Sequence, residues 1–436
     1  MSLDSEYSVF ASLRQAGPLA VGSETRLDAP FSAENRLWVK NLGKSDYTVA
    51  KYRALRRQIF DILGVESFRE IAALIALPER QEEQSCRVYA RLGNMFGMTG
   101  TAGEIAARVQ EYARAADAVI NSLKGKIFAD YASHIALTNE IEVTSDPVRL
   151  LLICFDDRYH KKARFEARRK LQLMNLAGSI DQRERETRIE EKFLAFLSFL
   201  NDFVWSHSQK IGEHDIVYLL SQHRPEDYSC AEARVLSATE ACQVKPGAYE
   251  KLTLLKRRRF ETDGETIPIY VSIRKKPPEA KILKLLRKNE KNPAVAVDDE
   301  LGLMAVLDSQ KDIRAFQKHL TQSALRADSF MVLEDISDTL SGSAYRSSAT
   351  GSSAQTPMLK FFARLGGMRV EFIIHTNRTW LNYMYRRDVA HDEYEVKRIF
   401  DSGVAEILFP QDIFALDHPA IRQSILEHFR RKIELT

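Results

Sequence analysis

The sequence has few cysteines and no long apolar run. Among its 436 residues are four cysteines, none in a C-x-x-C pair, so neither a zinc ribbon nor a thiol redox motif is indicated. No apolar run approaches the roughly 20 residues that a membrane-spanning helix needs, and the start of the chain lacks the pattern of a secretory leader. We therefore expect a cytoplasmic protein with reduced thiols and no membrane partner.

An excess of one charge is also missing. The 63 Lys and Arg residues nearly balance the 60 Asp and Glu residues, which gives a formal net charge of +3. The field of the whole protein therefore does not argue for nucleic acid or an acidic membrane, and any basic site must be local. A chain of 436 residues is long enough for two or three domains.

The first part of the chain has helical spacing. From about residue 46 to about 222 the apolar residues recur at helical intervals, and β-branched alternation is nearly absent. This pattern predicts a helical domain over 46–240, after an N-terminal arm over 1–45. Thr101 and Glu104 have the spacing of a capping box at the start of one of its helices.

Two segments of this helical part have distinctive surfaces. A helix predicted at 181–206 carries an apolar stripe that needs a partner helix or sheet. The segment HKKARFEARRK at 160–170 is basic and could face nucleic acid or an acidic protein. Since it lacks the aromatic residues that stack bases, we favour a solvated face. The helical domain as a whole could still bind a protein partner.

After about residue 245 the pattern changes to short β-type runs. These runs are PIYVSI at 268–273, LGLMAVL at 301–307, SFMVLED at 329–335 and RVEFIIH at 369–375. Helical patterns and a polar loop separate them, which predicts a mixed α/β domain over 245–410. The segment 411–436 is predicted to form a C-terminal helix. The expected fold class is therefore α+β, with a helical part followed by a mixed domain.

The stretch RKKPPEAKILK at 274–284 is the first candidate site. Strand alternation places Arg274 on the polar side of its strand, and the Pro-Pro pair then ends the strand and starts a helix. Arg274, Lys276 and Lys284 can surround a polyphosphate with fork-shaped and point charges. The alternative is a lysine-rich helix face exposed to solvent.

Two carboxylates at strand ends are the second candidate. Asp299 precedes the apolar run at 301–307, and Glu371 shares one face of RVEFIIH with Ile373 and His375. If the two strands are neighbours, Asp299 and Glu371 can hold one Mg²⁺ together with substrate phosphate oxygens. The alternative for each acid is an ordinary surface charge. A further alternative for the whole chain is a helical protein with a small α+β cap, in which Asp299 and Glu371 would lie far apart.

Four ordered motifs in residues 250–400 resemble the RelA/SpoT-type alarmone synthetases. The basic motif of that family resembles Arg274, Lys276 and Lys284, and its Asp-x-x-Gly strand resembles Asp299 to Gly302. Its Gly-Tyr-x-Ser-x-His turn resembles Ala344 to Ala349, and its Glu-x-Gln-x-Arg-Thr strand resembles Glu371 to Thr376. The segment Ala390 to Tyr394 resembles an Ala-His-x-x-Tyr helix that follows these motifs in the family.

The resemblance implies a nucleotidyltransferase-like fold and transfer of pyrophosphate from ATP to a guanine nucleotide. In such an enzyme Asp299 and Glu371 bind Mg²⁺ as the catalytic carboxylates, and Glu371 can also accept the hydroxyl proton. The cations Arg274, Lys276 and Lys284 hold the ATP phosphates.

The resemblance also implies an acceptor site. Tyr345 stacks the base of the acceptor nucleotide, Arg346 and Ser347 lie beside it, and His375 belongs to the nucleotide-binding residues. A separate hydrolase domain is not expected, because the isolated pair His214-Asp215 does not supply the necessary metal ligands.

Four departures from the family pattern concern polar groups. Met304 stands where the family has Arg, Ala349 where it has His, Ile373 where it has Gln, and His375 where it has Arg. An isoleucine cannot make the hydrogen bond of a glutamine, so the acceptor or the activity must differ. The acceptor could be GDP, GTP, an adenine nucleotide or, as in some toxin relatives, the 3′ end of a tRNA. The alternative is a degenerate domain that binds nucleotide or protein and regulates.

Overall fold

The computed structural model describes residues 46–206, 214–297, 299–342 and 356–435, which form two compact units. The described part of the first, the helical unit, comprises 46–187, 277–297 and 399–421. That of the second, the sheet unit, comprises 188–206, 214–276, 299–342, 356–398 and 422–435. Both units are therefore built from separate stretches of the sequence. The predicted N-terminal arm lies outside the described residues.

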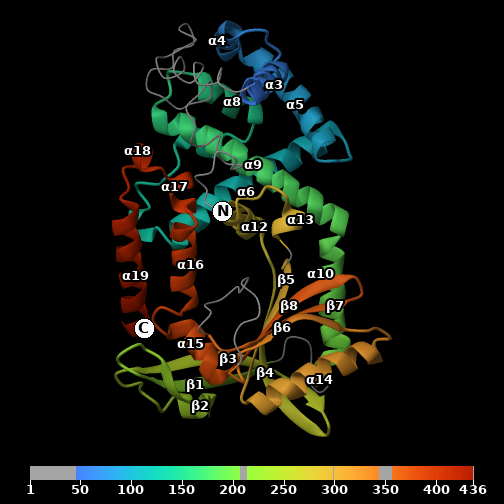
Figure 1. Cartoon of the computed structure of the whole chain (residues 1–436), viewed down its shortest axis with the longest axis vertical. Helices are drawn as coiled ribbons and strands as arrows, with labels where there is room; N and C mark the ends of the chain where they lie inside the picture. The colour runs from blue at the N-terminus through green and yellow to red at the C-terminus, as the bar shows by residue number, and fades with distance from the viewer. Residues whose placement is uncertain (1–45, 207–213, 298, 343–355, 436) are drawn as a thin grey trace. The chain divides into compact units, whose positions relative to one another are not determined.

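Helices α6 and α9 are the longest elements of the helical unit, and α12 packs against both of them (Figure 1). The helices of this unit are α3 (Asp46–Leu63), α4 (Phe68–Ala76), α5 (Pro78–Met95), α6 (Ala102–Lys126), η1 (Ala129–Tyr131), α7 (Asn139–Val143), α8 (Pro147–Phe155), α9 (Lys161–Thr187), α12 (Pro278–Lys288), α13 (Pro293–Ala296), α17 (Val404–Leu408) and α18 (Gln411–Phe414).

Helix α6 begins with the predicted capping box. The backbone N–H of Glu104 donates to Thr101 Oγ1 over 3.3 Å, and the Glu104 carboxylate accepts from the backbone N–H of Thr101 over 2.7 Å. Two backbone N–H groups that have no partner within the helix are thus hydrogen-bonded. The prediction from the Thr-x-x-Glu spacing is confirmed.

The basic segment at the start of α9 is buried, so the predicted solvated face is wrong. Lys170 donates to Asp117 over 2.7 Å, and the Arg169 guanidinium lies 5.2 Å from the ring centroid of Phe409 and donates to the Leu408 carbonyl. Long apolar stems allow Arg and Lys to pass through a core when acids and carbonyls meet their charged ends. The spacing of charges in one helix does not reveal such partners.

The sheet unit contains an eight-stranded sheet within the described residues, with strand order β2-β1-β3-β4-β5-β8-β7-β6. All neighbouring strands are antiparallel except β5 and β8, which are parallel. The strands are β1 (Asp215–His223), β2 (Cys230–Ser237), β3 (Glu250–Thr262), β4 (Glu265–Lys275), β5 (Leu301–Leu307), β6 (Val332–Asp338), β7 (Leu359–Leu365) and β8 (Met368–Thr376). A helical part and a mixed sheet confirm the expected α+β class.

Helices of the sheet unit lie on both sides of its strands. They are α10 (Ile189–Phe199), the π-helical turn η2 (Leu200–Val204), α11 (Ala238–Ala241), α14 (Gln310–Arg326) and α15 (Asn377–Tyr385). Two further helices, α16 (His391–Asp401) and α19 (His418–Leu435), have residues in both units. No helix in the described part of the chain is long and apolar enough to cross a membrane.

Two boundaries differ from the prediction. The predicted helical domain extends to 240, but β1 and β2 occupy 215–223 and 230–237. The helix predicted at 181–206 is interrupted at Arg188, whose φ of 51° lies in the left-handed region. A residue in that conformation cannot continue an α-helix, so α9 ends at Thr187 and α10 begins at Ile189.

One face of the sheet packs on α10, η2 and α14. Phe372 of β8 stacks on Phe361 of β7 with ring centroids 5.0 Å apart, and Phe196 of α10 meets Phe372 edge-on at 6.2 Å. Phe316 of α14 belongs to the same core. Since side chains alternate along a strand, the other residues of β4, β5 and β8 face the opposite side. There Trp380 and Leu381 of α15 cover part of the sheet.

Candidate active site

Three adjacent strands bring Arg274, Gly302 and Glu371 into one row. In the antiparallel pair β4 and β5 Arg274 is the partner of Gly302, and in the parallel pair β5 and β8 Gly302 is the partner of Glu371. Directly paired residues lie on the same face of a sheet. The strands that carry the two carboxylate motifs are thus neighbours, which was the condition for a shared metal site.

Gly302 gives the Arg274 side chain room to cross the central strand. A Cβ atom at position 302 would lie 3.1 Å from Arg274 Nε, closer than ordinary van der Waals contact between such atoms. Without it, Arg274 Nη2 donates to Glu371 Oε2 over 3.2 Å. The glycine between the two strands therefore permits the ion pair.

Glu371 is a buried carboxylate held by two cations. Its side chain is 3% exposed, and Lys360 Nζ lies 3.0 Å from Oε1, on the other oxygen from Arg274. Burying a carboxylate is costly unless it is paired, which these two cations achieve. A carboxylate can accept about four hydrogen bonds. The described residues therefore leave Glu371 capacity for a ligand.

The two candidate metal carboxylates do not line the same pocket. Asp299 is paired with Lys276, whose backbone N–H donates to the Glu300 carbonyl over 2.9 Å and so extends the pairing of β4 and β5. Asp299 precedes Gly302 by three residues, about 10 Å along an extended strand. Within the described residues, no group of three or more His, Cys, Asp and Glu side chains could hold a metal ion.

A pocket opens on the face that carries this row. Its volume is about 110 Å³, enough for several water molecules or a phosphoryl group. The lining residues are Ser272, Arg274, Gly302, Leu303, Met304, Glu371, Ile373, Tyr383 and His391. Two of the apolar residues that depart from the family pattern, Met304 and Ile373, thus form part of its wall. The pocket lining combines one cation, one carboxylate, apolar side chains and the polar side chains of Ser272, Tyr383 and His391.

His375 lies on the same strand as Glu371 but does not line the pocket. Its side chain is completely buried, and burial lowers the pKa of His375 to about 4, against a smaller opposite effect of the Pro357 carbonyl. The imidazole is therefore neutral at pH 7. A neutral, enclosed ring does not supply the charge of the arginine that the family has at this position.

The remaining predicted residues lie elsewhere. Lys284 is 9% exposed and belongs to α12 of the helical unit. Next to it, Lys281 is completely buried and its Nζ lies 2.5 Å from Glu184 Oε1, so this face of α12 is not the solvated lysine face of the alternative interpretation. Tyr345, Arg346 and Ser347 lie outside the described residues.

Three residues of the site were not among the predicted ones. No sequence pattern indicates Lys360, because the role of a lysine on a buried strand depends on the acid that packs beside it, here Glu371. His391 belongs to the segment that resembles the Ala-His-x-x-Tyr helix, which was a usable signal. Tyr383 lies between two histidines, with its ring centroid 5.0 Å from that of His391 and 5.5 Å from that of His375.

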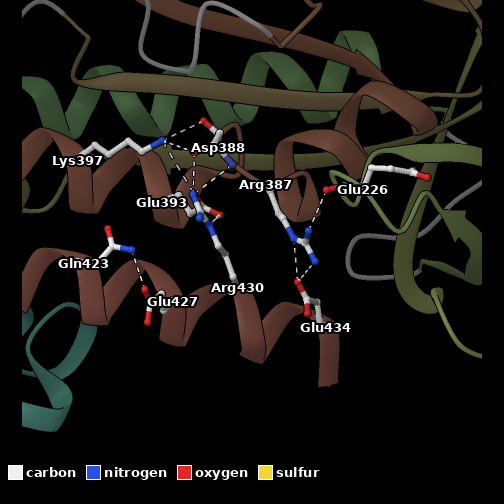
Figure 2. Close-up of polar contacts among 9 residues, drawn as sticks. All are labelled: Glu226, Arg387, Asp388, Glu393, Lys397, Gln423, Glu427, Arg430 and Glu434. Atoms are coloured by element: carbon white, nitrogen blue, oxygen red, sulfur yellow. Dashed lines mark hydrogen bonds and ion pairs between the residues drawn. The ribbon is translucent and has the colours of Figure 1, made fainter.

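Charged contacts hold the turn that carries His391. Figure 2 shows Arg430 between Asp388 and Glu393, with Nη2 2.8 Å from Asp388 Oδ1 and 3.1 Å from Glu393 Oε2. Glu393 is completely buried and also accepts from the backbone N–H of Asp388 over 3.1 Å. Arg387 pairs with Glu434 and donates to the Glu226 carbonyl. The turn between α15 and α16 is thus fixed at several points.

The pocket offers one hard oxygen ligand for a metal ion. Mg²⁺ is commonly bound by one or two carboxylates together with substrate phosphates and water. Glu371 fits that requirement for a Mg²⁺ that arrives with nucleotide phosphates, whereas Asp299 is paired with Lys276 and lies away from the pocket lining.

Comparisons with protein-family models, with curated proteins and with solved structures found no match for this chain. Its chemistry must therefore be argued from the residues of the site.

Proposed function

We propose that the chain is a divergent, Mg²⁺-dependent pyrophosphokinase with a RelA/SpoT-like nucleotidyltransferase domain. It transfers pyrophosphate from ATP to a hydroxyl group of a nucleotide or of a tRNA 3′ end, in the cytoplasm. The observation that carries the proposal is the row of Arg274, Gly302 and Glu371 on β4, β5 and β8, at the floor of one pocket. Three of the resembling motifs supply this row.

The cations of the first motif hold the phosphates of ATP in this proposal. The Arg274 side chain is half-exposed, at 50%, and contacts the carboxylate through one nitrogen. The Arg274 guanidinium can bind two phosphate oxygens at once, so it binds a phosphate more strongly than it binds Glu371 through a single hydrogen bond. Lys276 follows on the same strand end and adds a point charge. Lys284 belongs to the helical unit and is given no role in the proposed site.

Glu371 positions the acceptor and accepts its proton. The hydroxyl oxygen of the acceptor attacks the β-phosphorus of ATP, the bond from that phosphorus to the α-phosphate oxygen breaks, and AMP leaves. The hydroxyl proton passes to the Glu371 carboxylate, which Lys360 holds in place at 3.0 Å. Glu371 would also hold a Mg²⁺ that arrives with the nucleotide, whereas Asp299, which is paired with Lys276 and does not line the pocket, is not proposed as a second ligand of that ion. A bound Mg²⁺ neutralises charge on the phosphate oxygens.

Met304 and Ile373 support a change of acceptor. Both line the pocket beside Glu371, and neither can hydrogen bond to a polar group of an acceptor. A site without hydrogen-bonding side chains at these positions cannot select an acceptor through hydrogen bonds there. GDP, GTP, ADP, ATP and tRNA are therefore all acceptors to test, with Tyr345, Arg346 and Ser347 as the proposed acceptor-binding residues.

The test is an incubation of the purified protein with radiolabelled ATP, Mg²⁺ and each acceptor. The wild type is expected to form a labelled product with at least one of them. Glu371→Gln keeps the shape of the side chain but removes the base, so the rate should fall by about 100-fold or more. The matched control is Asp263→Asn, an exposed acid in the turn between β3 and β4, which should keep the wild-type rate.

A second function has one observation in its favour. Both oxygens of Glu371 already contact cations, Arg274 and Lys360. This arrangement suits a domain that binds ATP as a signal, without turnover, and passes the signal to a protein partner of the helical part. ATP binding that persists in the wild type without any labelled product would favour this regulator and contradict the enzyme.

A further inference from the structure

His391 is a residue of the pocket to which the proposed reaction assigns no role. It is the first residue of α16 and lines the pocket together with Arg274 and Glu371. We propose that the neutral His391 imidazole binds the substrate by donating a hydrogen bond from Nε2 to a phosphoryl oxygen. This inference rests on the proposed function, because it assumes that phosphate occupies the pocket.

The surroundings of the two ring nitrogens of His391 indicate which of them carries the proton. His391 Nδ1 is buried and has no hydrogen-bond partner among the described residues. A buried N–H without a partner costs about 1–3 kcal/mol, so we infer that Nδ1 is the unprotonated nitrogen of the neutral ring. The proton is then on Nε2, which also makes no hydrogen bond within the described part of the chain. Nε2 is available as a donor to a ligand.

The groups around His391 keep its ring neutral. Burial lowers the pKa of His391, and Arg274 of β4 and Arg398 of α16 lower it further. Glu395 and Asp392 of α16 act in the opposite direction. The titratable groups that also line the pocket are Tyr383 of α15 and Glu371 of β8. His391 therefore contributes a directed donor without a charge, while Arg274 contributes the charge.

The orientation of the ring is fixed before a ligand arrives. The His391 ring lies against Tyr383 at an interplanar angle of 30° and a centroid distance of 5.0 Å. The turn that precedes His391 is held by the contacts of Asp388 with Lys397 and Arg430 (Figure 2). A donor that needs no reorientation loses little entropy when it binds.

His391 also adds a hydrogen-bond donor to a pocket that Met304 and Ile373 line in part. The side chains of Met304 and Ile373, which also line the pocket, have no hydrogen-bond donor. Since the family pattern has Arg and Gln at these two positions, His391 supplies a hydrogen bond from another element. The His391 donor therefore selects compounds with a phosphoryl oxygen that can accept a hydrogen bond. Both ATP and inorganic pyrophosphate have such an oxygen.

The test is a calorimetric titration of the full chain with inorganic pyrophosphate. His391→Leu removes the donor and should weaken binding about tenfold or more, as for a hydrogen bond to a charged group. His391→Gln keeps an N–H at similar reach and should recover most of the affinity. The control His428→Leu removes an exposed histidine of α19 and should bind as the wild type does.

A second readout does not depend on the folding of the variants. Nitrogen-15 chemical shifts of the wild-type imidazole should show the proton on Nε2, and this signal should move when pyrophosphate is added. Equal affinity of the wild type and His391→Leu, or a ring protonated on Nδ1, overturns the role of His391 and leaves the phosphate pocket intact. A wild type that does not bind pyrophosphate overturns both the role of His391 and the pocket.

Discussion

Position 302 shows how a single missing side chain determines a contact across three strands. The Arg274 side chain passes over Gly302 to reach Glu371, and a Cβ there would meet Arg274 Nε at 3.1 Å. The Asp-x-x-Gly pattern could be recognised in the sequence, and with it the position of the glycine. The sequence alone does not reveal that this glycine makes room for an arginine from β4, because that role depends on the pairing of β4 with β5.

Gly302→Ala should weaken ATP binding by several-fold. The added methyl group displaces Arg274 from its position over β5, and a displaced guanidinium makes poorer phosphate contacts. The cost in stability should stay below about 1 kcal/mol, because Arg274 is flexible and half-exposed. Calorimetry with a non-hydrolysable ATP analogue and urea denaturation measure the two effects.

Gly103→Ala is the matched control for this change. A Cβ at position 103 meets no atom within 4 Å, and the residue lies in the first turn of α6. This variant should keep the ATP affinity and gain slightly in stability from the higher helix propensity of alanine. If Gly302→Ala binds the analogue as tightly as Gly103→Ala does, Arg274 does not hold phosphate.

His375 should make the protein less stable in mild acid. The pKa of the imidazole is about 4 in the folded state, below the value of 6.5 expected in the unfolded chain. Above pH 6.5 both states are neutral and His375 contributes no pH dependence. As the pH falls from 6.5 to about 4 the unfolded state takes up the proton first, so the free energy of unfolding decreases.

The size of this effect is on the order of 3 kcal/mol, the free-energy equivalent of the difference between the two pKa values. Urea denaturation of the wild type and of His375→Phe at a series of pH values measures it. His375→Phe should show the smaller loss between pH 6.5 and 4, and the control His134→Gln, at an exposed position, should follow the wild type. Parallel profiles for wild type and His375→Phe would contradict the buried neutral imidazole.

At the scale of elements, the four predicted β-type runs overlap β4, β5, β6 and β8, whereas β1, β2, β3 and β7 were not predicted. The runs LGLMAVL and RVEFIIH predicted β5 and β8 because both lie in the middle of the sheet and are buried. β1 and β2 lie at one end of the sheet, where only part of each strand is buried. Their short apolar pattern resembles that of a helix, so the predicted helical domain extended over them.

Arg430→Met should destabilise the turn between α15 and α16. Arg430 contacts the completely buried Glu393, and its removal leaves that carboxylate with fewer hydrogen bonds. The expected loss is about 1–3 kcal/mol in the free energy of unfolding. The control is Gln423→Ala, which removes an exposed contact with Glu427 on the same helix (Figure 2) and should cost less than about 0.5 kcal/mol. Equal losses in the two variants would show that Glu393 does not depend on Arg430.

On the scale of the whole molecule, the sequence predicted the α+β class but neither the row of Arg274, Gly302 and Glu371 nor how the chain divides into units. The segment RKKPPEAKILK begins in the sheet unit and ends in the helical unit, which includes residues 277–297. The predicted phosphate cations therefore belong to two units, with Arg274 and Lys276 in one and Lys284 in the other. The spacing of apolar residues reports only on short segments of the sequence. The division of the chain into units depends on contacts between distant segments, such as those of α12 with α6 and α9.

The central claim is that the site directs an acceptor hydroxyl to the β-phosphorus of ATP. Phosphorus-31 NMR of the reaction with Mg·ATP and the productive acceptor tests this directly, because each position of attack releases a different nucleotide product. The account predicts AMP together with an acceptor that has gained two phosphates. Release of ADP or of free pyrophosphate as the reaction product would contradict it.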